Sequence, residues 1–204
     1  MPTRQNWFEG WRLFAGLALT LMALSLWISG MQQFEVDGVR MVIRFTARTS
    51  LLFFCLAFGA AALARLWPNA WTRWLRRNRR TLGVTFATSH AIHAIAIGCF
   101  AVMDPAGYTA ATNIASYLFG GIGYAFIILM AVTSFDRTAH AIGASAWRRL
   151  HLTGGYYLLF QFTVSFGKRV PEMPLYALFL LPLVAVFALR MIAMTPRAQL
   201  GVQA

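Results

Sequence analysis

The sequence is poor in charge, and acidic residues are the scarcest of its charged groups. Only 12% of its 204 residues are Asp, Glu, Lys or Arg, whereas soluble domains carry roughly 25%. Six acidic residues stand against 18 basic ones, which gives a formal net charge of +12. This shortage excludes a chain that water solvates over most of its surface, because such a surface needs many more ionised side chains.

Cysteines and recognisable catalytic motifs are also few. The two cysteines, Cys55 and Cys99, both lie inside apolar runs, which is typical of buried small side chains rather than of a disulfide. We find no glycine-rich phosphate loop, no dinucleotide-binding fingerprint, no nucleophile motif and no internal repeat. The sequence therefore reveals no flavin or nicotinamide site.

Long apolar runs take the place of charge, and 59% of the residues are hydrophobic. A helix of about 20 apolar residues crosses a bilayer. Six runs have about this length: 11–30, 47–67, 81–103, 113–135, 150–166 and 174–194. The fifth is the shortest, and Pro182 predicts a kink in the sixth. The sequence predicts an all-α membrane protein, a six-transmembrane-helix bundle in which residues 1–204 form a single transmembrane domain.

The basic residues predict how this bundle is oriented. The N-terminus, the 68–80 and 136–149 loops and the C-terminus, together with Arg65 and Arg190, carry 13 of the 18 basic residues. Positively charged loops stay cytoplasmic, so both termini are predicted to be cytoplasmic. The first run lacks a following small-residue cleavage site, so we expect a span rather than a cleavable signal. We interpret the positive net charge as a signal that orients the chain in the membrane, rather than as a sign of nucleic-acid binding.

Five arginines gather between the second and third runs: Arg73, Arg76, Arg77, Arg79 and Arg80. Such a cluster at a membrane boundary attracts anionic lipid headgroups. The lipid bilayer is therefore the first partner that the sequence predicts.

Histidines are the polar residues that most need an explanation. His90 and His93 lie inside the third run, three residues apart and so on one helix face. His151 opens the fifth run, and His140 lies in the preceding loop. Ionisable side chains inside a bilayer are costly and suggest a function, and histidine is a frequent ligand of haem iron and of other metals.

Other interpretations of these histidines remain open. A neutral histidine can form a hydrogen bond to a neighbouring helix, and His151 can be an interfacial residue. His140 is expected to be a solvated loop residue. A zinc or copper site at His90 and His93 is a further alternative, although zinc usually takes three or four protein ligands.

Glycines near these histidines allow two interpretations. Those of the fourth and fifth runs permit close helix packing, and they also make room for a flat macrocycle: Gly120, Gly121, Gly123, Gly154 and Gly155.

Four stretches carry a resemblance to a known family. They are Phe45-Thr46-Ala47-Arg48-Thr49, Arg79-Arg80-Thr81-Leu82-Gly83 leading to His93, the run 116–134, and Trp147-Arg148-Arg149-Leu150-His151. In their order and spacing, residues 45–170 resemble the ferric-reductase-like transmembrane domain. The closest likeness is to the haem-bearing membrane subunit of the bacterial protein-methionine-sulfoxide reductase system.

The resemblance implies haem b between the third and fifth spans of a protein in the bacterial inner membrane. His93 corresponds to the family's outer histidine on the third span, and His151 corresponds to the inner histidine on the fifth. His90 is not at a standard ligand position, although some members have extra histidines on that helix. Arg79, Arg80, Arg148 and Arg149 are expected to pair with the propionates of the inner haem, because arginine binds carboxylates bidentately.

Two departures from the family pattern matter. The family's outer histidine on the fifth span falls at Val164, and its inner histidine on the third falls at Arg79. Each depth therefore keeps one ligand of the usual pair. At a rise of about 1.5 Å per residue, His93 and His151 differ in depth by some 16 Å, and His90 closes only about 4.5 Å of this gap.

One iron therefore cannot be held by His93 and His151 together. Three outcomes remain. In the first, one histidine holds the haem, and water, Gln161 or nothing occupies the second axial position. In the second, another span, for example through Met130, or a partner subunit supplies the second ligand. In the third, the protein has lost haem and kept the fold.

The leading hypothesis is a membrane haem-b electron-transfer protein, a candidate oxidoreductase subunit, that passes electrons across the inner membrane to an outer-side acceptor. A separate reductase or the quinone pool is the expected donor, and a periplasmic protein is one candidate acceptor. The alternative is a haem-free scaffold or assembly protein that kept only the fold.

Overall fold

The computed structural model describes residues 8–195, and every regular element in this part of the chain is helical. The elements are α1 (Gly10–Met31), α2 (Val36–Leu66), α3 (Ala70–Arg77), α4 (Arg79–Met103), α5 (Pro105–Ala111), α6 (Ile114–Val132), α7 (Asp136–Gly167), the 3-10 helix η1 (Pro174–Phe179) and α8 (Leu180–Met194). The predicted all-α class is confirmed.

Five segments are long and apolar enough to cross a membrane: α1, α2, α4, α6 and the stretch Pro174–Met194 that joins η1 to α8. They correspond to five of the six predicted spans. The remaining one, 150–166, is helical within α7, but α7 is not among the five. Polar residues such as His151 and Gln161 lower its hydropathy. Five of the six predicted spans therefore correspond to helical segments with the length and apolar composition of a span, and the sixth does not.

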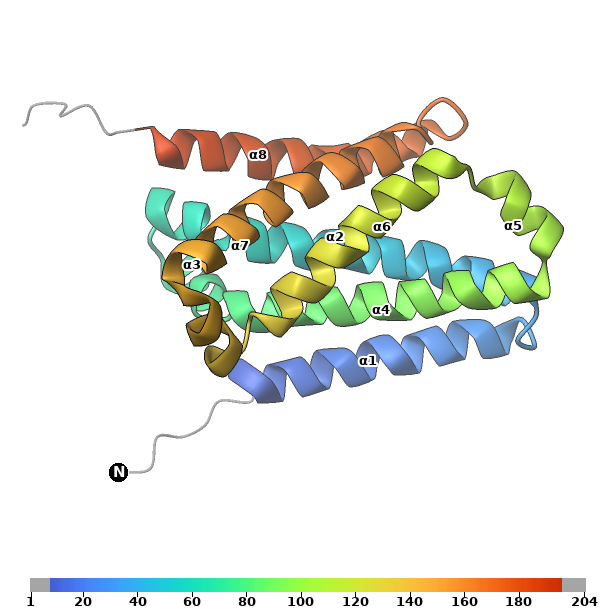
Figure 1. Cartoon of the computed structure of the whole chain (residues 1–204), viewed down its shortest axis with the longest axis horizontal. Coiled ribbons are helices and arrows are strands. Elements are labelled where there is room, and N and C mark those ends of the chain that lie inside the picture. Colours follow the sequence, from blue (N-terminus) through green and yellow to red (C-terminus); the bar gives the residue numbers. More distant parts are fainter. Residues whose placement is uncertain (1–7, 196–204) are drawn as a thin grey trace, which may run out of the picture.

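The long helices run side by side along the longest axis of the molecule (Figure 1). Helix α2 packs against α1, α4 and α8, and α7 packs against α6 and α8. Helix α3 and the start of α7 lie at one end, where the described chain also begins and ends, whereas α5 lies at the other (Figure 1). We call these the inner end and the outer end, after the predicted orientation.

Two predicted loops contain short helices, because local caps stabilise them. The Asn69 side chain accepts a hydrogen bond from the Thr72 amide at 2.9 Å, and the Asn69 amide donates to the Thr72 hydroxyl at 3.0 Å, which starts α3. Asp104 accepts from the Gly107 amide at 2.9 Å and starts α5. The residues directly after the third run thus form the cap of a helix.

Helix α2 begins at Val36, eleven residues before its predicted start at residue 47. The added turns bury Val39 and Val42 and leave Arg40 exposed, with its guanidinium 5.0 Å from the centre of the Phe100 ring. Arginines at this end hid the helix from a search for apolar runs, since an amphipathic end lowers the mean hydropathy.

Helix breaks occur at a glycine rather than at the expected proline. Pro182 lies in the first turn of α8, directly after η1, where a missing amide hydrogen costs no helical hydrogen bond. Near the position of the predicted kink, the chain therefore changes from a 3-10 helix to an α-helix. In α7 the backbone breaks at Gly143, whose φ of 77° is unfavourable for other residues.

An aromatic layer fills the middle of the bundle. Phe54 of α2 lies against Phe86 of α4 and Phe162 of α7, with ring centres 5.7 and 5.3 Å away. All three rings are buried. This layer ties α2, α4 and α7 together and lies between the two ends, each of which contains a cavity.

Candidate functional site

A buried seam of hydroxyl groups holds α2 against α4 and leads towards the outer end. Ser89 of α4 accepts one hydrogen bond from the Ser50 hydroxyl at 3.0 Å, and its hydroxyl lies 2.8 Å from that of Thr49, where either group can donate. Its own hydroxyl contacts the Thr46 carbonyl at 3.2 Å. Thr46, Ser50 and Ser89 have no exposed surface. Because these bonds are made in an apolar interior, they fix the register of the two helices at the level of the histidines.

His93 is oriented by this seam. Its Nδ1 lies 3.1 Å from the Ile43 carbonyl and 3.0 Å from the Thr46 hydroxyl. The Thr46 hydroxyl donates its proton to the Val42 carbonyl at 2.7 Å, so both partners of Nδ1 are acceptors. Nδ1 therefore carries the proton, and Nε2 of the neutral ring keeps a free lone pair. A protein typically prepares a metal-binding histidine in this way.

His90 and Tyr124 lie beside His93 with polar atoms that have no partner. The His90 ring centre is 5.1 Å from that of His93 and 5.1 Å from that of Tyr124. His90 Nδ1 and the Tyr124 hydroxyl are buried and form no hydrogen bond with any of residues 8–195. Because buried polar atoms are normally hydrogen-bonded, these two are candidate partners for a polar group that enters the site.

These residues line a cavity of about 400 Å³ between α4, α6 and α7, which we call the outer cavity. Ligand and cofactor cavities typically measure roughly 300–1,000 Å³. Gly120 and Gly121 of α6 line it, and a Cβ atom added at either would meet nothing within 4 Å. Gln161 of α7 lines it as well. A flat group placed there would find space on the glycine side and polar atoms on the histidine side.

A smaller cavity of about 210 Å³, the outer vestibule, adjoins the outer cavity and shares His93 with it. Its charged lining residues are Arg44, Arg48, Lys168 and Arg169. All four are exposed, and no ion pair joins any of them to a carboxylate among residues 8–195. The outer vestibule therefore presents positive charge next to His93.

His151 lies at the inner end and has the opposite arrangement. Its Nε2 lies 3.1 Å from the Thr133 hydroxyl, which donates its own proton to the Leu129 carbonyl at 2.7 Å. Thr133 therefore accepts a hydrogen bond from Nε2, and the proton of the neutral ring is on that nitrogen. The imidazole also stacks on Trp147, with ring centres 4.2 Å apart.

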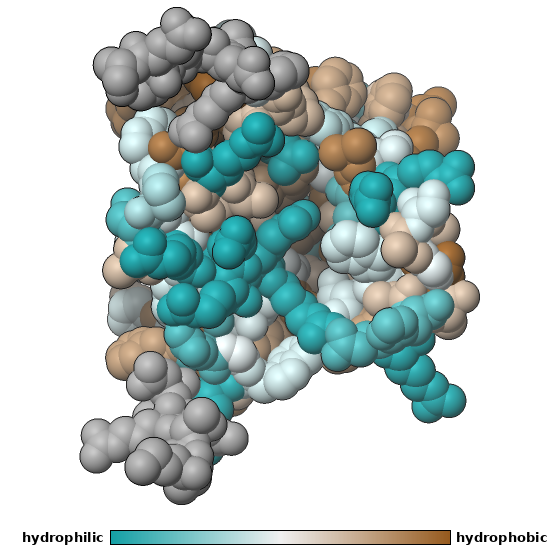
Figure 2. Space-filling model, turned by 90° about the vertical axis from the view of Figure 1, so that its left-hand side faces the viewer, coloured by the Kyte–Doolittle hydropathy of each residue, from teal (hydrophilic) through white to brown (hydrophobic). Residues whose placement is uncertain are grey.

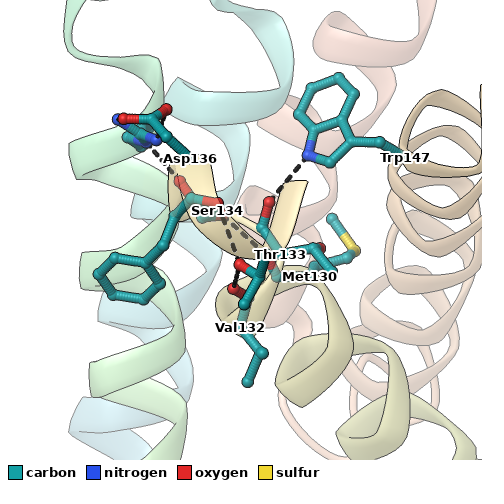
Figure 3. Close-up of polar contacts among 9 residues, drawn as sticks. Met130, Val132, Thr133, Ser134, Asp136 and Trp147 are labelled. Carbon is teal, nitrogen blue, oxygen red and sulfur yellow. Dashed lines mark hydrogen bonds and ion pairs between the residues drawn. The ribbon is translucent and has the colours of Figure 1, made fainter. Parts of the chain in front are cut away.

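Hydrogen bonds at the turn between α6 and α7 hold this arrangement (Figure 3). The Trp147 indole donates to the Thr133 carbonyl at 2.9 Å, and Ser134 donates to the Met130 carbonyl at 2.7 Å. Arg80 of α4 pairs with Asp136 and donates to the Ser134 carbonyl. The end of α6 is thus attached to both α4 and α7.

His151 borders a second cavity, of about 380 Å³, which we call the inner cavity. Four arginines line it: Arg76, Arg77, Arg79 and Arg80. Arg148 and Arg149 are exposed and are not among its lining residues. Of the four arginines expected to bind propionates, the structure brings Arg79 and Arg80 to the cavity of His151 and leaves the other two outside.

The histidines at the two depths lie in separate cavities. His90 and His93 line the outer cavity and His151 lines the inner one. Gln161 lies in the outer cavity, whereas Met130 lines the inner cavity. Residues 8–195 contain no group of three or more His, Cys, Asp or Glu side chains arranged to hold a metal ion. The zinc alternative at His90 and His93 therefore lacks a third ligand of these types.

Sequence reasoning missed three residues of these sites. Thr46 lies within a stretch that marks the family resemblance, but its contact with His93 depends on how α2 packs against α4. Tyr124 follows Gly120 by one helical turn, so a search for polar residues sharing the glycine face would have found it. Thr133 gave no signal, because a threonine at a helix end is ordinary.

Comparisons of this chain with models of known protein families, with curated proteins and with solved structures find no match.

Proposed function

We propose that this protein is a membrane haem-b electron-transfer protein with its haem in the outer cavity. The observation that carries the proposal is His93, whose Nδ1 proton is held by the Ile43 carbonyl and Thr46 while Nε2 is free. The resemblance of residues 45–170 to the ferric-reductase-like domain supports the same residue as the outer ligand.

The residues of the outer cavity fit such a group. His93 would hold the iron, and the polar residues Gln161 and Ser165 of α7 line the same cavity. The open space at Gly120 and Gly121 suits a planar macrocycle. The unpaired atoms of His90 and Tyr124 are available as hydrogen-bonding groups. When bound, haem b supplies a one-electron carrier whose potential depends on its ligands and surroundings.

The chain's own charges suit transfer towards an outer acceptor. The outer vestibule places four cations beside His93, and positive charge attracts an anionic acceptor or the acidic face of a partner protein. A separate reductase or the quinone pool would deliver electrons at the inner end. A second haem at His151 requires that Nε2 leaves Thr133.

A haem-free scaffold is the second candidate, and specific observations favour it. Val164 occupies the family's outer histidine position on α7 and is exposed, while Arg79 occupies the inner position on α4. The fold then remains and the histidines act as hydrogen-bonding residues between helices, as His93 and His151 both do.

The deciding experiment is a reduced-minus-oxidised absorption spectrum of detergent-purified protein from haem-replete cells, with the haem-to-protein ratio. We expect sharp α and Soret bands in the wild type and at least about a tenfold lower haem ratio in His93→Ala, since losing an axial ligand removes most of the affinity. His140→Ala is the matched control, because His140 is exposed. A colourless wild type, or a His93→Ala variant with full haem content, would reject the proposal.

A further inference from the structure

Among residues 8–195, Arg79 is a cation without a counter-ion at the wall of the inner cavity. It is half-buried, and within this part of the chain it donates no hydrogen bond and has no carboxylate within ion-pair distance. A second cation, Arg190, repels it. A partly buried and unpaired guanidinium in a membrane protein is costly, so its presence indicates an anion that binds there.

The neighbouring arginines sharpen this inference. Arg77 pairs with Glu9 at 3.2 Å, and Arg80 pairs with Asp136. Arg76 lines the same cavity and has no such partner among residues 8–195. The inner cavity therefore keeps two guanidinium groups, those of Arg76 and Arg79, for a ligand. Guanidinium groups bind phosphate oxygens in a bidentate manner.

Aromatic and aliphatic side chains form much of the remaining lining, among them Phe54, Phe58, Phe86, Ile127 and Met130. The polar residues Thr133, Ser134, Asp136 and His151 line the cavity as well. Hydrophilic side chains gather on the inner end face of the molecule and border a hollow (Figure 2). A cavity lined by both cations and hydrocarbon matches a molecule with an anionic head and an apolar tail. Basic pockets between helices on the cytoplasmic side of a membrane bind lipid headgroups in this way.

We propose that the inner cavity binds an anionic membrane phospholipid, with its phosphate on Arg76 and Arg79 and the start of an acyl chain against the phenylalanines. Haem is another anionic amphiphile, but His151 offers it no free Nε2 while Thr133 accepts the proton of that nitrogen. The proposal goes beyond the electron-transfer function and does not rest on it, because a lipid needs no histidine ligand.

The test counts lipids by native mass spectrometry on the delipidated full-length chain in neutral detergent, with phosphatidylglycerol or phosphatidylcholine added. We expect phosphatidylglycerol to be retained by the wild type, and retention to fall about tenfold or more in the double variant Arg76→Gln/Arg79→Gln. The matched control is Arg148→Gln/Arg149→Gln, which loses the same charge outside the cavity. Equal retention of both lipids, or equal losses in the two double variants, would overturn the proposal.

A second variant leaves the charge unchanged. A Cβ added at Gly83, which lines the cavity, meets nothing within 4 Å, so Gly83→Leu should fold and fill the space of the acyl chain. We expect it to reduce phosphatidylglycerol retention as well. Glycerol 3-phosphate that competes as well as the lipid would identify a soluble phosphate site instead. A fall in the haem-to-protein ratio in Arg76→Gln/Arg79→Gln would identify a haem site. Either result rejects the lipid.

Discussion

The outer and inner ends of this bundle each hold a histidine, and threonine hydroxyls give the two rings opposite tautomers. At the outer end, Thr46 and a carbonyl of α2 accept from Nδ1 of His93, which lines the outer cavity, so Nε2 has no hydrogen-bond partner among residues 8–195. At the inner end, Thr133 accepts from Nε2 of His151, so that nitrogen is occupied. Identical residue types therefore leave Nε2 available at one end and use it in a hydrogen bond at the other.

The lesson of this comparison is that the hydrogen-bond partner, and not the histidine itself, decides which nitrogen can bind a metal. The surroundings differ in the same sense. Within residues 8–195, the outer cavity holds unpaired polar atoms of His90 and Tyr124, whereas the inner cavity holds the unpaired cations Arg76 and Arg79. The outer end is suited to a metal-centred group and the inner end to an anion.

The largest expected effect concerns the two histidines directly. We expect His93→Gly to lose haem by about tenfold or more, and added imidazole to restore it by occupying the vacated space. His151→Gly should keep most of the haem, because its Nε2 is already used. Haem-to-protein ratios with and without imidazole measure both effects. Equal losses in the two variants would contradict the difference between the ends.

Thr133→Val sharpens the comparison by removing the acceptor of His151 Nε2 while keeping the shape of the side chain. Because His151 borders the inner cavity, we expect the freed nitrogen to become able to bind haem iron there. The bound haem per chain should rise from about one towards two, since valine cannot accept the hydrogen bond. A haem count on the purified variant is the measurement. Thr163→Val is the control, since within residues 8–195 this hydroxyl bonds only to the Leu159 carbonyl.

The glycines of α6 and α7 differ in what surrounds them. A Cβ at Gly155 would lie 2.5 Å from the Phe58 ring, whereas one at Gly121 meets nothing. We expect Gly155→Ala to destabilise the protein by about 1–3 kcal/mol through overpacking, and Gly121→Ala to have little effect. Thermal unfolding in detergent compares the two variants. A Gly155→Ala variant as stable as the wild type would show that Phe58 moves aside freely.

The smallest effect concerns the ion pair of Asp136 with Arg80. The hydrogen bond and charge of Arg80 lower the pKa of the Asp136 carboxyl. Its contribution to stability is therefore present above the usual carboxyl pKa of about 3.9 and is lost as pH falls through the lowered value. We expect Asp136→Asn to unfold slightly earlier than the wild type near neutral pH and equally at strongly acidic pH. A constant difference at all pH values would contradict this assignment.

Hydrophobic runs were enough to predict the helical class and five helices of membrane-spanning length, because hydrocarbon-facing helices need about 20 apolar residues whatever their neighbours are. Segments that depend on polar caps or on amphipathic packing escaped this search. Helices α3 and α5 and the first turns of α2 belong to this group. Segment 150–166 of α7 differs, because the sequence predicted it as a span but it is not among the five apolar helices. Its polar residues line cavities and lower the hydropathy of a helix that packs within the bundle.

The sequence by itself determined that His90, His93, His151 and the arginine cluster are the polar groups needing an explanation, because ionisable residues are costly in hydrocarbon. The tertiary structure decided which nitrogen of each ring is free and which arginines have partners. These properties depend on atoms of other helices, such as the Ile43 carbonyl and the Thr133 hydroxyl. Contacts of about 3 Å between distant segments follow from packing, which local sequence patterns do not encode.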